Sequence, residues 1–213
     1  MKINEIFYSL QGEGPDLGLP AIFVRLSGCN LSCDWCDTEH ESGTEMTIDQ
    51  VVKSVTQDGQ WSHCKNVIIT GGEPLIQDEC EDLIKNLVVE GRNVFVETNG
   101  TVYNPNIIGY CKFVVSPKLE NIEDIKSYYE KIQNWNGNAV FKFVIGDYEE
   151  FVKTKDFVKI MNLKNVYFMP KSSKDTSMKQ LMLELVEWVK KESPNIKVTP
   201  RLHIYLYGLR KGT

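Results

Sequence analysis

Three cysteines within eight residues are the most distinctive chemical feature of this sequence. Cys29, Cys33 and Cys36 follow the spacing C-x3-C-x2-C, and Gly28 before them allows the backbone to turn tightly. Three thiolates can ligate three irons of a four-iron, four-sulfur cluster and leave the fourth iron open to a small molecule. The spacing also fits a structural zinc site with His40 as fourth ligand. The residues alone leave both alternatives open.

Three further segments combine polar side chains with glycine or proline where apolar runs end. They are residues 71–74 (Gly-Gly-Glu-Pro), 98–100 (Thr-Asn-Gly) and 116–118 (Ser-Pro-Lys). The cysteine loop follows the apolar run 21–26 in the same way. Because ligands of parallel α/β folds bind at the carboxyl ends of strands, we expect these four segments to surround one site.

Six short runs rich in Val, Ile and Phe predict the β-strands that position these segments. The runs are residues 21–26, 67–70, 93–97, 113–116, 140–145 and 166–168. Most are continuously apolar, as strands buried on both faces of a parallel sheet are. Residues 1–9 alternate between polar and apolar, which is typical of a further strand.

Amphipathic stretches between most of these runs predict four helices. Thr47 and Gln50 form a capping box before the first, and Gly91 is positioned to end the second. The apolar stripes are residues 48, 51, 52 and 55; 83, 84, 87 and 88; 122, 125, 129 and 132; and 181, 185 and 189. The alternation indicates a parallel sheet with too few units for a closed eight-stranded barrel. On pattern alone, an open doubly wound sheet and a partial barrel both stay possible.

The composition is typical of a single globular domain spanning residues 1–213. A formal net charge of −5 argues against a large nucleic-acid footprint, and we interpret Arg201, Arg210 and Lys211 as solvated charges. No apolar stretch reaches the ~18 residues that cross a bilayer, and residues 1–9 lack the apolar core of a signal peptide. We therefore expect a cytoplasmic protein without a membrane partner. Its other cysteines, at positions 64, 80 and 111, are expected to be buried or inert.

Together, the cysteine loop and residues 71–74 resemble the radical S-adenosylmethionine (SAM) superfamily. A narrower resemblance, to the 7-carboxy-7-deazaguanine synthase family, covers nearly the whole chain. It rests on residues 7–14 (FYSLQGEG), 23–26 (FVRL), 36–38 (CDT), 97–100 (ETNG), 116–118 (SPK) and 201–203 (RLH). The resemblance implies an α/β fold, namely a partial (β/α)6 barrel with parallel strands, shortened and modified relative to the full radical SAM core.

This family converts 6-carboxy-5,6,7,8-tetrahydropterin to 7-carboxy-7-deazaguanine with release of ammonia, on the route to queuosine and related 7-deazapurines. The resemblance therefore implies a radical SAM carbon–nitrogen lyase that uses a [4Fe–4S] cluster, SAM and Mg²⁺. It also implies a homodimer, a small-molecule pterin substrate and a reductant of the flavodoxin or ferredoxin type. The cofactor supplies the radical, so no protein residue is assigned a catalytic role.

The same resemblance assigns the binding residues by position. The cluster ligands are Cys29, Cys33 and Cys36, and the magnesium ligand is Thr38. The residues implied to bind SAM are Trp35, Cys36, Asp37, Gly72, Glu73, Asn99, Ser116, Pro117 and Lys118. The residues implied to bind substrate are Leu10, Gln11, Gly12, Glu13, Arg25, Thr70, Glu97 and His203.

The chemistry of several residues fits these roles. Arg25 lies in an apolar strand and offers a planar fork that can bind the substrate carboxylate through two hydrogen bonds. Glu97 can accept two N–H groups from the pterin's amino-pyrimidinone edge. The Thr38 hydroxyl is a hard oxygen ligand that alone binds Mg²⁺ weakly, so we expect metal binding to depend on substrate. His203 is compatible with a substrate contact or a core histidine. Met169 replaces a glutamine of many relatives, which leaves residues 169–172 without an assigned role.

Overall fold

Nine strands form one mixed sheet in the part of the chain that the structure describes. The structure, a computed structural model, describes residues 1–33, 36, 38–57, 61–121, 125–171, 178–208, 210 and 212. The strands are β1 (Lys2–Leu10), β2 (Pro20–Leu26), β3 (Thr44–Glu45), β4 (Asn66–Gly71), β5 (Asn93–Thr98), β6 (Lys112–Val115), β7 (Ala139–Ile145), β8 (Val166–Pro170) and β9 (Lys197–Val198). Their order in the sheet is β3-β1-β2-β4-β5-β6-β7-β8-β9.

The six predicted strands form the parallel centre of this sheet. From β2 to β9 all neighbours are parallel, whereas β1 pairs antiparallel with both β2 and β3. Apart from the antiparallel edge, the strands are arranged in the order in which they occur in the chain. A doubly wound sheet requires that order to reverse. The prediction of a partial barrel is therefore confirmed, and the doubly wound alternative is wrong.

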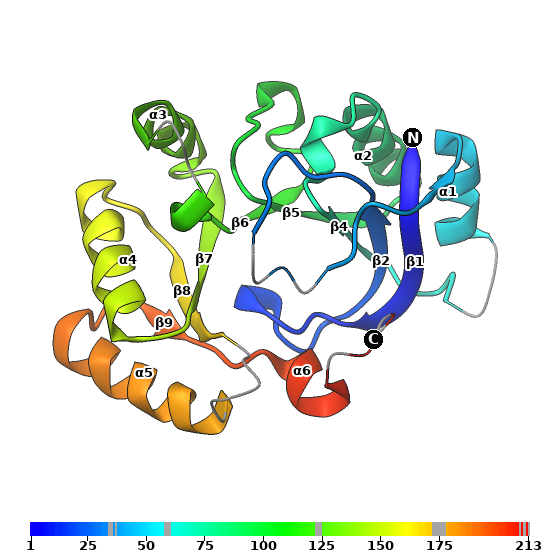
Figure 1. The fold of residues 1–213 in the computed structure, drawn as a ribbon. Helices are drawn as coiled ribbons and strands as arrows, with labels where there is room; N and C mark the ends of the chain where they lie inside the picture. Colours follow the sequence, from blue (N-terminus) through cyan, green and yellow to red (C-terminus); the bar gives the residue numbers. More distant parts are fainter. Residues whose placement is uncertain are drawn as a thin grey trace.

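The helices lie on the outer side of the curved sheet (Figure 1). They are α1 (Ile48–Thr56), α2 (Cys80–Val89), α3 (Ile125–Trp135), α4 (Tyr148–Ile160), α5 (Met178–Glu192) and α6 (Leu202–Tyr207). Short 3-10 turns occur at η1 (Gly14–Asp16), η2 (Pro74–Ile76), η3 (Pro105–Ile107) and η4 (Leu119–Asn121). Helices α1 to α5 surround the sheet, whereas α6 lies across the opening, close to β1 (Figure 1). No described helix is both long and apolar enough to cross a membrane.

Local sequence explains where most helices begin and end. The predicted capping box is present, because Thr47 accepts from the Gln50 amide and the Gln50 side chain accepts from the Thr47 amide. Gly91 adopts φ +72° directly after α2, as a helix-terminating glycine does. One helix was missed, because α4 was not predicted. Between β5 and β6, where no helix was predicted, the structure has only the single turn η3.

Two apolar clusters pack on opposite faces of the sheet. The larger lies between the sheet and the helices and includes Trp135, Phe141, Phe151 and Phe168. The smaller lies inside the barrel and consists of Phe7, Ala21, Phe23, Ile68 and Phe95. Residues two apart on a strand face the same side. The inner cluster therefore forms a floor, and the side chains two positions further along β2, β4 and β5 stand above it.

Arg92 is a buried cation that organises the segment between α1 and β4. It is 8% exposed, and its guanidinium donates to the backbone carbonyls of Thr56, Ser62 and Cys64. Its Nε has no hydrogen-bond partner among the described residues. A buried charge solvated by backbone carbonyls stabilises the path of the chain instead of offering a ligand site.

Candidate active site

A cavity of about 260 Å³ opens at the carboxyl ends of the parallel strands. Phe7 and Phe23 of the inner apolar cluster lie at its base. Above them stand Arg25, Thr70 and Glu97, each two residues beyond a floor residue of the same strand. Arg25 and Thr70 are direct neighbours in the β2–β4 register. Strand alternation thus places a polar layer on an apolar floor.

Most residues predicted to bind ligands line this one cavity. They are Leu10, Gln11, Gly12, Glu13, Arg25, Cys29, Cys33, Cys36, Thr38, Thr70, Gly72, Glu97, Asn99, Ser116, Lys118 and His203. Pro117 and Glu73 do not line it. Trp35 and Asp37 lie outside the described residues, as does Ser172. The sequence-based expectation that four loops surround one site is therefore met by residues from the cysteine loop, 71–72, 98–99 and 116–118.

The cysteine loop is held against the Gly71–Gly72 turn by backbone contacts. The Gly28 amide donates to the His40 carbonyl at 2.7 Å, and the Glu73 amide donates to the Gly28 carbonyl at 2.9 Å. A Cβ on Gly72 would collide with the Gly28 carbonyl oxygen and lie 2.7 Å from the Cys29 Cβ. Glycine at position 72 is therefore required for this close approach.

The donor set of the loop fits an iron–sulfur cluster. All three cysteines face the same cavity, which leaves room for a ligand beside them. Burial raises the pKa of Cys33, and the positive charge of Lys118 opposes that rise. Burial likewise raises the pKa of Cys29. Within the described ranges, no three His, Cys, Asp or Glu side chains are gathered as they are around a bound ion. His40 Nδ1 is buried with no hydrogen-bond partner among those residues.

Glu73, which was predicted to contact SAM, is held beneath the cavity by hydrogen bonds within the protein. Its side chain is fully buried below the cavity, and its carboxylate accepts from Thr98 Oγ1 at 2.8 Å and from the Asn99 amide at 2.6 Å. It also accepts from the Leu75 amide at 3.1 Å, at the start of η2. Burial raises the pKa of Glu73 to about 7 despite these hydrogen bonds. The carboxylate therefore ties strand ends β4 and β5 together.

Asn99 connects this buried carboxylate to the cysteine loop. Its side-chain amide donates to Asn30 Oδ1 at 3.1 Å and lies 4.0 Å from Cys29 Sγ. Tyr128 of α3 donates to the Asn99 carbonyl at 2.8 Å. The Asn99 side chain thus faces the cavity from a backbone that is fixed on both sides.

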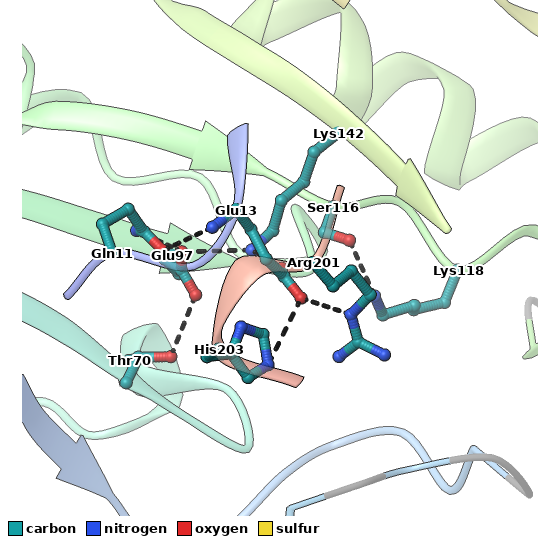
Figure 2. A network of polar contacts seen from close by, with 9 residues as sticks. All are labelled: Gln11, Glu13, Thr70, Glu97, Ser116, Lys118, Lys142, Arg201 and His203. Atoms are coloured by element: carbon teal, nitrogen blue, oxygen red, sulfur yellow. Dashed lines mark hydrogen bonds and ion pairs between the residues drawn. The ribbon is translucent and has the colours of Figure 1, made fainter. Parts of the chain in front are cut away.

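A network of charged side chains occupies the opposite wall of the cavity (Figure 2). Lys142 Nζ lies 2.6 Å from Glu13 Oε2 and 3.0 Å from Glu97 Oε1. Gln11 Nε2 donates to the same Glu97 oxygen at 3.0 Å, and Thr70 Oγ1 donates to the other at 3.4 Å. Burial acts to lower the pKa of Lys142, but Glu13 and Glu97 outweigh it and raise that pKa.

The interpretation of Arg201 as a solvated charge is wrong. Arg201 is 6% exposed, and its Nε donates to Glu13 Oε1 at 2.6 Å (Figure 2). His203 Nε2 lies 4.0 Å from the same oxygen, and its ring packs against Gly12. The Leu202 amide also donates to the Gly12 carbonyl at 2.8 Å. Helix α6 therefore docks on the loop after β1, although that loop is far away in sequence. Arg210 is described as a further lining residue of the cavity.

Arg25 has a partner that the sequence did not suggest. Its Nε donates to Glu5 Oε1 at 2.8 Å, and its guanidinium lies 5.5 Å from the centre of the Phe7 ring. Both members of the pair line the cavity and are about three-quarters buried. Glu5 holds one edge of the guanidinium, which orients the planar fork within the site.

Sequence reasoning missed Glu5, Lys142 and Arg201. For Lys142 a usable indication was present, since a lysine stands inside the apolar run Val-Phe-Lys-Phe-Val. The same feature in β2 had singled out Arg25. Arg201 is paired with a residue 188 positions earlier, so no local pattern could reveal its burial.

Residues 23–143 match the radical SAM superfamily, so the fold and the cysteine-lined cavity belong to a radical SAM enzyme. A 7-carboxy-7-deazaguanine synthase from Pyrobaculum aerophilum is 33% identical over the whole chain, which covers 97% of that relative. Another from Bacteroides thetaiotaomicron is 44% identical over 135 residues, 61% of this chain and 70% of the relative. The chain belongs to the 7-carboxy-7-deazaguanine synthase family.

A solved structure has the same fold. QueE from Escherichia coli superposes with a TM-score of 0.72 at 24% identity, over 95% of this chain and 94% of that one. The superfamily implies SAM and a [4Fe–4S] cluster. The three cysteines described above are the residues that would hold that cluster.

Proposed function

We propose that this enzyme converts 6-carboxy-5,6,7,8-tetrahydropterin to 7-carboxy-7-deazaguanine with release of ammonia, as a step of queuosine and related 7-deazapurine biosynthesis. The observation that carries the proposal is the arrangement of one cavity. Its outer rim holds Cys29, Cys33 and Cys36, and its inner wall holds Arg25 and Glu97. A cofactor at the rim and a small anionic substrate on the inner wall would share the same enclosed space.

The rim residues support binding of the cofactor. When bound, SAM ligated to the cluster supplies the hydrogen-abstracting radical with which the ring contraction begins. Gly72 and Asn99 line the space beside Cys29, and Ser116 accepts from Lys118 Nζ at 2.7 Å on the other side. These groups offer polar contacts to the amino-acid and ribose parts of such a ligand. The protein's own contribution is to hold SAM and the substrate close together and in the correct orientation.

The inner wall supports binding of a carboxylated pterin. Arg25 would bind the substrate carboxylate, because a guanidinium held at one edge by Glu5 still offers a planar face of N–H donors. Glu97 would accept the N–H groups of the amino-pyrimidinone ring. The apolar floor formed by Phe7 and Phe23 excludes water beneath the ring, which strengthens these polar contacts.

Thr38 completes the proposed site. Thr38 lines the cavity beside Cys36, where its hydroxyl would complete the coordination of a magnesium ion held chiefly by substrate and water.

We further propose that the enzyme is a homodimer in a reducing cytoplasm and receives its electron from a flavodoxin- or ferredoxin-type protein.

The direct test is a product assay with an anaerobically reconstituted protein. Incubation with carboxytetrahydropterin, SAM, dithionite and Mg²⁺ should give 7-carboxy-7-deazaguanine and ammonia, detected by mass spectrometry. Arg25→Gln should raise the substrate KM while the iron content stays at the wild-type level. Lys190→Gln, which removes an exposed ion pair with Glu187 on α5, is the matched control and should behave as wild type. Absence of any deazapurine from iron-loaded wild-type enzyme would overturn the proposed function.

A further inference from the structure

Lys142 is a buried cation inside the barrel for which the family resemblance assigned no role. It lies on β7 between Phe141 and Phe143, which pack in the outer core, so alternation directs Lys142 into the cavity. The residue is 5% exposed, and its ammonium contacts Glu13 and Glu97 at 2.6 Å and 3.0 Å. Figure 2 shows the ammonium between the two carboxylates.

Stability alone is a weak reason for a lysine at this position. Moving a lysine and two carboxylates out of water costs free energy that their mutual attraction only partly recovers. An apolar residue of similar volume would fill the same space in the cavity wall at lower cost. A charged network in a cavity wall therefore suggests that the orientation of its members matters.

The hydrogen bonds show which oxygens remain for a ligand. Glu97 Oε1 accepts from both Lys142 and Gln11 at 3.0 Å, whereas Oε2 receives only the longer 3.4 Å contact from Thr70 among the described residues. Glu13 differs, because Oε2 is bound by Lys142 and Oε1 by Arg201, each at 2.6 Å. Glu97 thus has one oxygen fixed and one weakly occupied, and both oxygens of Glu13 are strongly bound.

We propose that Lys142 is a positioning and specificity-determining residue. Arg201 holds Glu13, and Glu13 in turn holds the Lys142 ammonium. The ammonium fixes the Glu97 carboxylate so that Oε2 faces the ring N–H donors of the pterin. The inference rests on the proposed function. The inference also assigns Glu13 a different role, because it makes this residue an anchor for Lys142 and α6 instead of a direct substrate ligand. Lys142 contacts Glu13 from the loop after β1 and Glu97 from β5, whereas Arg201 and His203, at the start of α6, approach the other oxygen of Glu13.

The proposal predicts that variants of Lys142 lose selectivity for a ligand with a 2-amino group over one without it. The test compares Kd values of carboxytetrahydropterin and its 2-oxo (lumazine) analogue, measured by calorimetry on iron-loaded enzyme with SAM and Mg²⁺ but no reductant. Wild type should prefer the pterin. Lys142→Met should weaken pterin binding by about 10- to 100-fold, the effect of misplacing a charge-assisted hydrogen bond, and should weaken analogue binding far less. In this variant the ratio of the analogue Kd to the pterin Kd should therefore approach one.

Companion variants separate positioning from a general structural role. Lys142→Gln keeps a hydrogen-bond donor but no charge and should also bring the ratio of the two Kd values closer to one. This variant therefore replaces Lys142→Met in the test if the Met variant fails to fold. Lys142→Arg should retain more of the preference than either. Lys155→Met, which removes a lysine that is about three-quarters buried and paired with Glu192 on the outer surface, should leave both Kd values unchanged. Iron content and uncoupled SAM cleavage should match wild type in all folded variants.

Two results would overturn the inference while leaving the proposed function intact. In the first, folded Lys142 variants keep the wild-type preference for the pterin. In the second, both ligands weaken equally, which indicates general loosening of the cavity. Failure of the proposed function looks different, because wild-type enzyme itself would then neither bind the pterin nor form the deazapurine.

Discussion

The contact between Gly72 and the cysteine loop makes a sharp prediction about cluster assembly. The substitution is Gly72→Ala. Its added Cβ would collide with the Gly28 carbonyl oxygen and lie 2.7 Å from the Cys29 Cβ and 2.8 Å from the Gly28 carbonyl carbon. Because apolar carbons pack at about 3.5–4.0 Å, the loop that begins at Gly28 must retreat by about 1 Å.

The cost of this retreat can be worked out from the contacts. Overpacking a tight site costs about 1–3 kcal/mol. The same movement strains the 2.9 Å hydrogen bond from the Glu73 amide to the Gly28 carbonyl, which contributes about 1 kcal/mol. The free energy of holding the cysteine loop in place should therefore fall by about 2–4 kcal/mol.

The assay is iron and sulfide content per chain after anaerobic reconstitution, together with the visible absorbance of the cluster. Gly72→Ala should bind clearly less iron than wild type and lose it faster to a chelator. Gly91→Ala is the matched control, since Gly91 has open space around it and lies near the amino end of β5, opposite the cavity. Its φ of +72° costs about 1 kcal/mol of global stability but should leave the iron content unchanged. Full, stable iron loading of Gly72→Ala would refute the argument that this contact fixes the loop.

Three further predictions concern magnesium, stability and pH. Thr38→Ala should retain the iron of the wild type but lose most of the stimulation of product formation by Mg²⁺; an unchanged magnesium titration would remove Thr38 from the metal site. Arg92→Met should lower the free energy of unfolding by about 2–4 kcal/mol in urea titrations, because one buried and two partly buried carbonyls lose their donor, whereas an effect below about 0.5 kcal/mol would contradict that role. Burial raises the pKa of Glu13, but Lys142 and Arg201 outweigh it and hold that pKa well below 4.5. The ionised form thus contributes stability that is present above pH 4.5 and lost as the pH falls through the folded-state pKa. Thermal unfolding should accordingly show a steeper loss below pH 4.5 in wild type than in Glu13→Gln, and parallel curves would contradict the ion-pair assignment.

The parallel core was predictable because buried strands leave a dense local pattern. All six runs of Val, Ile and Phe became strands, and continuous apolarity correctly indicated burial on both faces. Helix α4 was not predicted from the sequence because Glu and Lys separate its apolar residues, of which Phe151, Phe157 and Val158 are buried. No helix was predicted between β5 and β6, and the structure has only the turn η3 there.

The sequence indicated which residues line the cavity where the chemistry of a single residue was sufficient, and it missed residues whose partners are distant. The cysteines, Arg25 and Glu97 stand out by type and by their position at strand ends. Glu73 was predicted to contact SAM, but the sequence did not indicate that its carboxylate accepts from the Thr98 hydroxyl and the Asn99 amide, both at the end of β5. Pairs such as Glu13 with Arg201 depend on the closure of the whole barrel, which local sequence does not encode.

The docking of α6 on the loop after β1 has a consequence for synthesis. Ribosomes make Glu13 long before Arg201, which follows it by 188 residues. During most of translation Glu13 therefore lacks the Arg201 guanidinium that neutralises it, even after the cysteine loop has emerged. A nascent chain that lacks α6 therefore has the cysteines but not the complete wall of the cavity. The order of the sequence thus delays competence for reactive chemistry until the barrel is nearly complete.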